Sequence, residues 1–385
     1  MTEVCIVGAG LGGLTCALAL ARQGVGVTVL EQAPALGEVG AGITLSPNSS
    51  RVMAHLGLGE RLAPLAVVPG TQVTQHWQSG AVVRTTARGA EMLSRHGFPY
   101  VHLHRADLHG VLAAAVAAAA PGAIRLGQAV ARAGRDGTVT LADGRRLGPF
   151  DAVVGADGVR SAVRAALWPT EPPPHFTGQV AWRGIVPADA LPVAHRAHSP
   201  GIHVGPGKLF MRYPVRGGSL VNYAAFVAMD GWRDDSWSIR STVAELLEHF
   251  GDWDALVPAI IGATAEGQLF KWALHARAPL DDWVRGRVTL LGDAAHAMLP
   301  FLGQGAGTAI EDGMVLARCL AGFPVQEALA RYEAARRERT TMVQAQSRMI
   351  GMAFQGEDPA SLGRGPMQDE EALGLFDYDA IECKV

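Results

Sequence analysis

The chain has 385 residues, of which 49% are apolar and 18% are charged, and its formal net charge is -3. This length exceeds what one hydrophobic core of ordinary size holds, so we expect two packed domains or one large α/β unit with insertions. The nearly neutral charge gives no electrostatic basis for binding nucleic acid or an anionic membrane, and we exclude both as partners.

The start of the chain and the pattern of cysteines indicate the cellular compartment in which the protein is expected. A strand is expected to begin at Val4, with no basic segment, apolar stretch and cleavage site before it. The longest apolar runs, such as 111–120, are too short to cross a bilayer. The four cysteines form no CxxC pair and are typical of small buried residues in a reducing compartment: Cys5, Cys16, Cys319 and Cys383. We therefore expect a cytoplasmic protein.

The first thirty residues carry a dinucleotide-binding pattern. An apolar strand leads into a glycine-rich turn, an Ala- and Leu-rich helix follows, and a second apolar strand ends at Glu31. Gly8 permits the tight turn, Gly10 lets backbone approach a pyrophosphate, and Gly13 lets the helix pack closely on the sheet. The helix N-terminus favours phosphate. Glu31 can accept hydrogen bonds from an adenosine ribose without a 2′-phosphate, which indicates FAD or NAD.

Two further glycine–acid turns follow apolar strands later in the chain. Residues 151–164 read DAVVGADGVRSAVR, and Asp157 lies in the turn between the expected strand and helix. By itself this turn is equally typical of an ordinary β-turn. Residues 288–296 read VTLLGDAAH, with Asp293 at the end of a strand and another helix expected near Gly305. An acid in that position can accept hydrogen bonds from the ribityl hydroxyls of a flavin.

Together these motifs resemble those of the group A flavoprotein monooxygenases, the single-component aromatic hydroxylases with the p-hydroxybenzoate hydroxylase fold. The resemblance covers nearly the whole chain and rests on three stretches: GAGLGG at 8–13, GADGVRSAVR at 155–164 and LLGDAAHAMLPFLGQGAGTAIEDG at 290–313. Four more stretches, at 40–48, 104–108, 180–184 and 213–218, are similar to the salicylate hydroxylase-like branch. That branch includes 3-hydroxybenzoate 6-hydroxylase and 6-hydroxynicotinate 3-monooxygenase.

The resemblance implies an α/β fold with a Rossmann-like FAD-binding domain of GR2 type, an interleaved mixed-sheet substrate domain and C-terminal helices. We assign residues 1–70, 100–175 and 275–350 to the FAD-binding domain, residues 71–99 and 176–274 to the substrate domain, and residues 351–385 to a C-terminal tail. The tail is expected either to be mobile or to dock on the domain or on a partner subunit. Arg and Glu alternate at 331–339, which predicts a solvated helix face.

The implied activity is FAD-dependent hydroxylation of a small aromatic substrate, either a phenolic or a hydroxy-heteroaromatic acid. NADH or NADPH reduces FAD, and the reduced flavin reacts with O2 to give a C4a-hydroperoxide that transfers oxygen to the ring. Because the cofactor carries the hard chemistry, the protein has to position and dry the site. Another flavoenzyme of the same fold (an epoxidase, an N-hydroxylase or an oxidase) is the alternative. We expect a monomer or homodimer and no metal site.

The resemblance also implies site residues. The expected FAD contacts are Gly8, Gly10, Gly13, Glu31, Arg105, Asp157, Asp293, Gly305 and Ala306. The expected catalytic groups are His203, Tyr213 and Pro300, and the expected substrate contacts are Arg183, Met211, Arg212, Asn222 and Phe301.

Each of these assignments has a structural alternative. Strand-borne His, Met and Tyr residues commonly fill cores. Arg183 and Arg212 suit a substrate carboxylate, although the family carries arginine at position 183 with differing substrates, which favours a structural role. Thr44 stands where the 6-hydroxynicotinate enzyme has histidine, so that substrate is not transferred to this chain.

Overall fold

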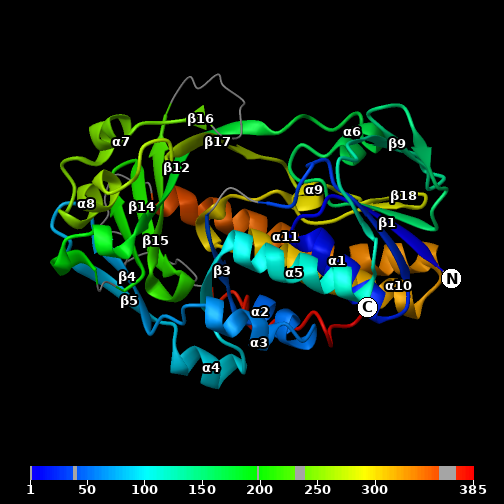
Figure 1. The fold of residues 1–385 in the computed structure, drawn as a ribbon, viewed down its shortest axis with the longest axis horizontal. Helices are drawn as coiled ribbons and strands as arrows, with labels where there is room; N and C mark the ends of the chain where they lie inside the picture. The colour runs from blue at the N-terminus through cyan, green and yellow to red at the C-terminus, as the bar shows by residue number, and fades with distance from the viewer. Residues whose placement is uncertain (1, 38–40, 197–198, 230–238, 355–369) are drawn as a thin grey trace.

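A six-stranded sheet and an eight-stranded sheet form the two halves of the molecule (Figure 1). The computed structural model describes residues 2–37, 41–196, 199–229, 239–354 and 370–385. The predicted α/β class is confirmed, and both sheets take strands from separate stretches of the chain. The predicted domain boundaries remain a prediction.

The six-stranded sheet is parallel except for one edge strand. Its order is β18-β19-β11-β1-β2-β7, and only β18 runs antiparallel to its neighbour. The inner strands are mostly apolar, because helices cover both faces of a parallel sheet. The strands are β1 (Glu3–Val7), β2 (Gly26–Leu30), β7 (Ile124–Arg125), β11 (Ala152–Gly155), β18 (Val284–Arg285) and β19 (Val288–Leu290).

Four long helices pack in this half of the molecule. Helix α1 contacts both α5 and α10, and α10 contacts α11 (Figure 1). Ten consecutive residues of α1, 11–20, are buried, so this helix is enclosed between the sheet and its neighbouring helices. The helices are α1 (Leu11–Arg22), α5 (Arg105–Ala119), α10 (Gly305–Gly322) and α11 (Val325–Phe354).

The eight-stranded sheet has the order β16-β17-β12-β15-β14-β13-β4-β5 and is antiparallel except where β13 pairs with β4. One face packs on α7 (Val243–Phe250) and α8 (Leu256–Gly262). The opposite face turns towards the six-stranded half. The strands are β4 (Thr71–His76), β5 (Val82–Ala87), β12 (His175–Pro187), β13 (Gly201–Gly205), β14 (Lys208–Val215), β15 (Leu220–Ala228), β16 (Ile239–Arg240) and β17 (Phe270–Ala276).

Shorter elements join the two halves. The two-stranded sheet of β3 (Gly42–Leu45) and β6 (Val101–His104) lies beside β14. The other helices are α2 (Pro47–His55), α3 (Gly59–Leu62), α4 (Ala90–His96), α6 (Ala162–Leu167) and α9 (Asp293–His296). A small sheet comprises β8 (Val130–Ala133), β9 (Val139–Leu141) and β10 (Arg146–Leu147). The 3-10 turns are η1 (Ala63–Leu65), η2 (Ala188–Ala190), η3 (Val193–His195), η4 (Arg216–Gly218) and η5 (Pro300–Leu302).

Residues 370–385 dock on the chain itself, which decides between the two expectations for this part of the tail. They run past α2 (Figure 1), and Arg51 Nη1 donates to the carbonyl of Tyr378 at 3.0 Å. Arg318 of α10 donates to the carbonyl of Cys383 at 2.9 Å. Residues 351–354 belong to the end of α11, and residues 355–369 lie outside the described residues.

The predicted solvated face at 331–339 is wrong for two of its arginines. Arg336 is fully buried, and the Arg339 side chain is only 10% exposed. Both bind carboxylates of α10, whereas Arg331 and Arg337 are more exposed and pair within α11 at i,i+4 spacing. The spacing of charges along one helix indicates only which residues of that helix are neighbours. It could not show that Arg336 and Arg339 of α11 would pair with acids of α10.

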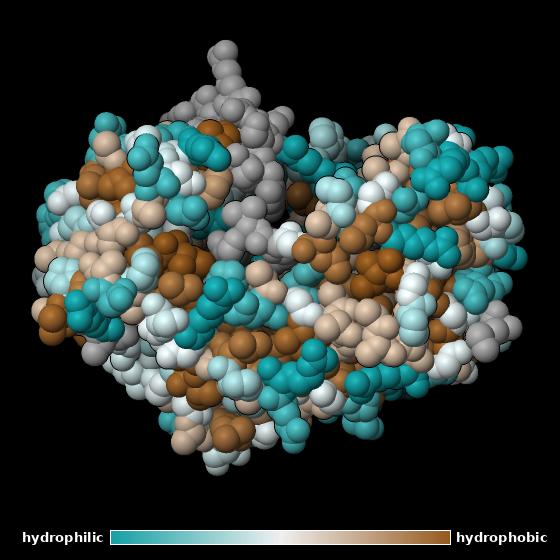
Figure 2. Space-filling model, in the orientation of Figure 1, coloured by the Kyte–Doolittle hydropathy of each residue, from teal (hydrophilic) through white to brown (hydrophobic). Residues whose placement is uncertain are grey.

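On the face shown in Figure 2, polar and apolar residues alternate in small groups, and the surface is indented between the two halves. None of the helices in the described part of the chain is long and apolar enough to cross a membrane.

Candidate active site

A cavity of about 430 Å³ lies between the two halves, which is a usual size for a small-molecule site. Its first wall consists of residues from turns of the six-stranded half: 10–13, Ala156, Gly158, 292–293, Pro300, Gly303, Gly305 and Ala306. Its second wall consists of side chains from β12, β14, β15 and β17. We call the first wall the cofactor half of the cavity and the second wall the substrate half.

The turn between β1 and α1 has the backbone that the glycine pattern predicts. Gly8 has a φ of 105°, and an added Cβ would lie 2.4 Å from the carbonyl oxygen of Ala156. A Cβ on Gly13 would lie 2.2 Å from the carbonyl oxygen of Gly8. Gly10, which lines the cavity, is different because its Cβ would meet no protein atom within 4 Å. The space beside Gly10 and the uncapped N-terminus of α1 fit a pyrophosphate.

Glu31 and His109 hold this turn in place through contacts with its backbone. The Glu31 carboxylate accepts hydrogen bonds from the backbone N–H groups of Ala9 at 2.8 Å and Ala33 at 2.9 Å. His109 of α5 contacts the carbonyl oxygen of Ala9 through Nε2 at 2.7 Å. Sequence reasoning missed His109, because a single histidine on a helix gives no signal of its partner. Glu31 does not line the cavity itself, and its contact with a ribose remains a prediction.

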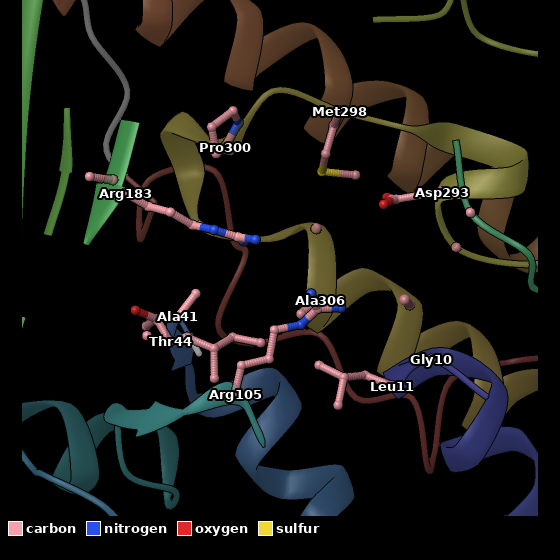
Figure 3. A pocket seen from close by; sticks show the side chains of 18 of the residues that line it. Gly10, Leu11, Ala41, Thr44, Arg105, Arg183, Asp293, Met298, Pro300 and Ala306 are labelled. Atoms are coloured by element: carbon pink, nitrogen blue, oxygen red, sulfur yellow. The ribbon is translucent and has the colours of Figure 1, made fainter. Parts of the chain in front are cut away.

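Arg105 and Asp293 project into the cofactor half from opposite sides (Figure 3). Arg105 is the first residue of α5, and its side chain extends towards Ala306. Asp293 begins α9, and its side chain is exposed where it faces the cavity. Desolvation by the surrounding protein raises the pKa of Asp293, while His296 and Arg105 oppose the rise. A carboxylate and a guanidinium so placed suit the hydroxyls and phosphates of FAD.

The first turn of α10 lines the cavity at Gly305 and Ala306, opposite Pro300 of η5. The helix begins at Gly305, close to where a helix was expected, and its N-cap residue Gln304 makes no side-chain capping bond. Its first backbone N–H groups therefore have no partner within the helix. They can stabilise negative charge on the adjacent ligand, as predicted for the flavin ring.

Asp157 lies outside the cavity lining, unlike its neighbours Ala156 and Gly158. Its carboxylate accepts hydrogen bonds from the Ser161 hydroxyl and from Val163 N–H, so it holds the N-terminus of α6. The last arginine of the same motif, Arg164, is buried and donates to the carbonyls of Ala294 and Ala295, each at 3.1 Å. Arg164 thus fixes the helical turn that follows Asp293, a role that the sequence analysis did not assign.

Tyr213 and Asn222 lie opposite each other on β14 and β15 in the substrate half. The Tyr213 ring stacks on His102 with centroids 4.4 Å apart, and its hydroxyl is hydrogen-bonded to Thr44. Burial raises the pKa of Tyr213 well above its ordinary value, so its hydroxyl stays protonated at neutral pH. Asn222 Oδ1 accepts from the backbone N–H of Gly42 at 2.6 Å. Tyr213 can therefore act as a hydrogen-bond donor in this wall.

Arg183 of β12 is the cation of the substrate half. Its guanidinium lies 4.9 Å from the centre of the Trp272 ring and points into the cavity towards the cofactor half (Figure 3). Stacking on an aromatic face holds a guanidinium in a defined orientation. Met211 and Phe226 of this half are apolar, and Met298 and Leu299 from the loop after α9 add two more apolar side chains to the cavity. The alternation of β17 could have drawn attention to Trp272, which sequence reasoning missed.

Three of the predicted catalytic and substrate residues lie outside the cavity. His203 and Arg212 lie on the opposite face of the sheet, where His203 contacts Asp254 at 3.1 Å and Arg212 at 3.3 Å. Successive strand residues face opposite sides, so Arg212 cannot share the cavity wall with Met211 and Tyr213. Phe301 packs on Phe226 with ring centroids 5.2 Å apart and does not line the cavity. We assign none of these three a contact with the substrate.

Comparisons with known proteins identify the family. The model of the FAD binding domain family matches residues 1–347. The chain belongs to this family. It is 39% identical to 3-amino-4-hydroxybenzoate 2-monooxygenase of Streptomyces platensis, over 91% of this chain and 88% of the relative. It is 34% identical to 6-hydroxynicotinate 3-monooxygenase of Pseudomonas fluorescens, over 93% of each chain. Klebsiella pneumoniae HpxO complexed with FAD and uric acid is similar in structure, with a TM-score of 0.84, 26% identity and coverage of 98% and 96%.

These findings confirm the resemblance to group A flavoprotein monooxygenases. The protein is an FAD-dependent aromatic monooxygenase that uses NAD(P)H and O2. The glycine turn, the open space at Gly10 and the Asp293 carboxylate are all suited to FAD. The individual site residues remain predictions.

Gly10 and Gly13 separate cofactor binding from folding. Gly10→Ala is expected to leave the melting temperature of the apoprotein unchanged, because the added methyl group meets no protein atom. It is expected to weaken FAD binding, because the methyl group occupies space in the cavity that the cofactor needs. Gly13→Ala is expected to destabilise the apoprotein by about 1–3 kcal/mol, because its methyl group meets the Gly8 carbonyl. Thermal unfolding and FAD titration check both results. Equal melting temperatures for the two variants would contradict the assignment.

Asp293→Asn is expected to change stability and FAD affinity in opposite directions. The raised pKa shows that the ionised carboxyl is disfavoured in the folded apoprotein, so its contribution to stability falls as pH rises. Removing the charge should therefore raise the melting temperature of the apoprotein at pH 7. The same change should weaken FAD binding about tenfold or more, because a charged acceptor for the ribityl chain is lost. Unchanged FAD affinity would exclude this role.

Proposed function

We propose that the substrate is a small aromatic acid with a ring hydroxyl group, which the enzyme hydroxylates on the ring. The observation that carries the proposal is the placement of Arg183 and Tyr213 in one largely apolar wall of the cavity. The names of two relatives also point to acids with a hydroxylated ring, 3-amino-4-hydroxybenzoate and 6-hydroxynicotinate. An apolar wall accommodates the ring, and a few polar groups fix its orientation.

Arg183 is proposed to bind the substrate carboxylate. A guanidinium can donate two parallel hydrogen bonds to a carboxylate, and Trp272 holds the Arg183 side chain in place from one side. This placement supports a contact with the substrate over a purely structural role, because the guanidinium points into the cavity (Figure 3). The carboxylate would then be held at a fixed distance from the cofactor half.

Tyr213 is proposed to donate a hydrogen bond to the ring oxygen of the substrate. Because burial keeps Tyr213 protonated, it acts as a donor and stabilises the ionised phenol. An ionised phenol has a more electron-rich ring, which favours attack on an electrophilic oxygen. His102 beside it is neutral, since burial and Arg88 lower its pKa to about 3.

FAD, when bound and reduced by NADH or NADPH, would activate O2, and one atom of that O2 would be transferred to the substrate. The chain would hold the pyrophosphate at Gly10 and the ribityl hydroxyls at Asp293. The N–H groups of Gly305 and Ala306 favour negative charge on the flavin. Pro300 and the apolar side chains Met298 and Leu299 keep water from the reacting atoms.

We also propose that the protein is cytoplasmic and acts as a monomer or homodimer. The cysteines support a reducing compartment: all four are free, and Cys5, Cys16 and Cys319 are buried.

Substrate-stimulated oxidation of NADH and NADPH tests the function. The flavoprotein is incubated with hydroxybenzoates, aminohydroxybenzoates and hydroxypyridine carboxylates, and products are identified by mass spectrometry. We expect one of these acids to stimulate oxidation and to gain one oxygen atom, with little H2O2. Stimulation with H2O2 alone, or an epoxide from an alkene, would favour the oxidase or epoxidase alternative.

Arg183 and Tyr213 are expected to affect different kinetic constants. Arg183→Met should raise KM for the acid by about 10–100-fold, because a charged hydrogen bond contributes about 1.5–3 kcal/mol. It should not alter turnover of the matching phenol that lacks the carboxylate. Tyr213→Phe should mainly lower kcat with both compounds. Steady-state kinetics with the compound pair checks the result, and equal losses for acid and phenol in Arg183→Met would exclude carboxylate binding.

A further inference from the structure

Four charged side chains form a buried cluster between α10 and α11, beneath the cofactor half of the cavity. We call Glu311, Asp312, Arg336 and Arg339 the ion cluster. Arg336 donates to Asp312 Oδ1 at 2.7 Å and to Glu311 Oε2 at 2.6 Å. Arg339 donates to both Glu311 oxygens at 2.8 Å. Two acids and two arginines balance in charge, and only Arg339 is at all exposed.

The ion cluster holds one turn of the cofactor half through Asp312. Asp312 Oδ2 accepts a hydrogen bond from the backbone N–H of Gly292 at 3.1 Å and contacts His296 Nε2 at 2.5 Å. Gly292 and His296 lie on either side of Asp293, the proposed ribityl acceptor. Burial by itself would raise the pKa of Asp312, but His296 and Arg336 outweigh it and hold the pKa at about 2. Asp312 is therefore ionised at neutral pH.

The same cluster holds the start of α10 through Asn48. Asn48 Nδ2 donates to Glu311 Oε1 at 2.5 Å and to Gln304 Oε1 at 3.2 Å. Gln304 is the N-cap residue of α10 and directly precedes Gly305 and Ala306, which line the cavity. The two turns that contact the cofactor half thus depend on one set of buried charges.

Tyr378, from the C-terminal segment, completes the cluster. Arg336 Nη1 is buried and makes no hydrogen bond of good geometry among the described residues, and the Tyr378 hydroxyl lies close enough to interact with the Arg336 guanidinium. The Tyr378 ring lies 4.7 Å from the Arg336 guanidinium and 4.1 Å from that of Arg339, measured to the ring centre. The ring is anchored from both sides, because Arg51 donates to the Tyr378 carbonyl at 3.0 Å and Arg339 to the Leu375 carbonyl at 3.0 Å.

We infer that Tyr378 is a positioning residue for FAD, which acts through the arginines of the ion cluster on the turns at Gly292 and Gln304. The ring faces both guanidinium groups where protein hydrogen bonds are incomplete, and a desolvated cation–π contact of this kind stabilises its geometry. Loss of the ring frees the arginines to reorient, and the carboxylates that hold the two turns lose their fixed partners. The C-terminal segment thereby contributes to cofactor retention, although Tyr378 does not line the cavity.

Titration of the apoprotein with FAD tests this inference. Tyr378→Leu keeps apolar bulk but removes the π system, and it is expected to raise the FAD dissociation constant by about tenfold. Tyr378→Phe keeps the ring and its cation–π contact with the arginines. Its FAD dissociation constant is expected to stay within about twofold of that of the unchanged protein. Tyr378→Met replaces the leucine variant if that variant does not give soluble protein.

Phe323→Ala provides a matched control for general destabilisation of α10 and α11. Its ring lies 4.0 Å from the Arg331 guanidinium and is remote in sequence from the two turns. We expect this variant to lower the apoprotein melting temperature without changing FAD affinity. Unchanged FAD affinity in Tyr378→Leu, an equal loss in Tyr378→Phe, or an equal loss in Phe323→Ala would each overturn the inference.

Discussion

Two carboxylates on α10, Glu311 and Asp312, are fully buried, and the cofactor half of the cavity depends on how their charges are satisfied. A buried carboxylate is strongly unfavourable unless ion pairs and hydrogen bonds replace its lost hydration. Arg336 and Arg339 supply the ion pairs, and the backbone N–H of Gly292 supplies one hydrogen bond. The hydrogen bond from Gly292 to Asp312 also fixes the turn that presents Asp293 to the cavity.

The two halves of the cavity use different parts of the chain. The cofactor half is formed largely by backbone at glycine turns and at the N-termini of α1 and α10, where free N–H groups suit phosphates and negative charge. The substrate half is formed by side chains on four strands, where Arg183, Tyr213 and Asn222 are polar groups in an apolar wall. Side chains on a sheet can change while the strands are retained, so this arrangement allows one cofactor site to serve different aromatic substrates.

Sequence reasoning succeeded where backbone geometry restricts the choice of residue. Gly8 and Gly13 leave no room for a Cβ, and Gly10 opens the space that a ligand needs. It was less reliable on the strands of the substrate half. Met211, Tyr213 and Asn222 line the cavity, but Arg212 was assigned with them although its strand position turns it the other way. His203 faces the same side as Arg212, and its fully buried polar contacts are those of a core residue.

The glycine turn at the start of the chain and Glu31 by themselves predicted a dinucleotide site, because these short-range patterns have direct physical causes. The resemblance of the three motifs to a known family then implied FAD and the reaction class. Only the tertiary structure decided which strand residues face the cavity and which partners bury Arg336 and Arg339. The register between strands sets the first, and packing between α10, α11 and the C-terminal segment sets the second. Both depend on contacts between residues far apart in the chain, and no local spacing in a single sequence contains that information.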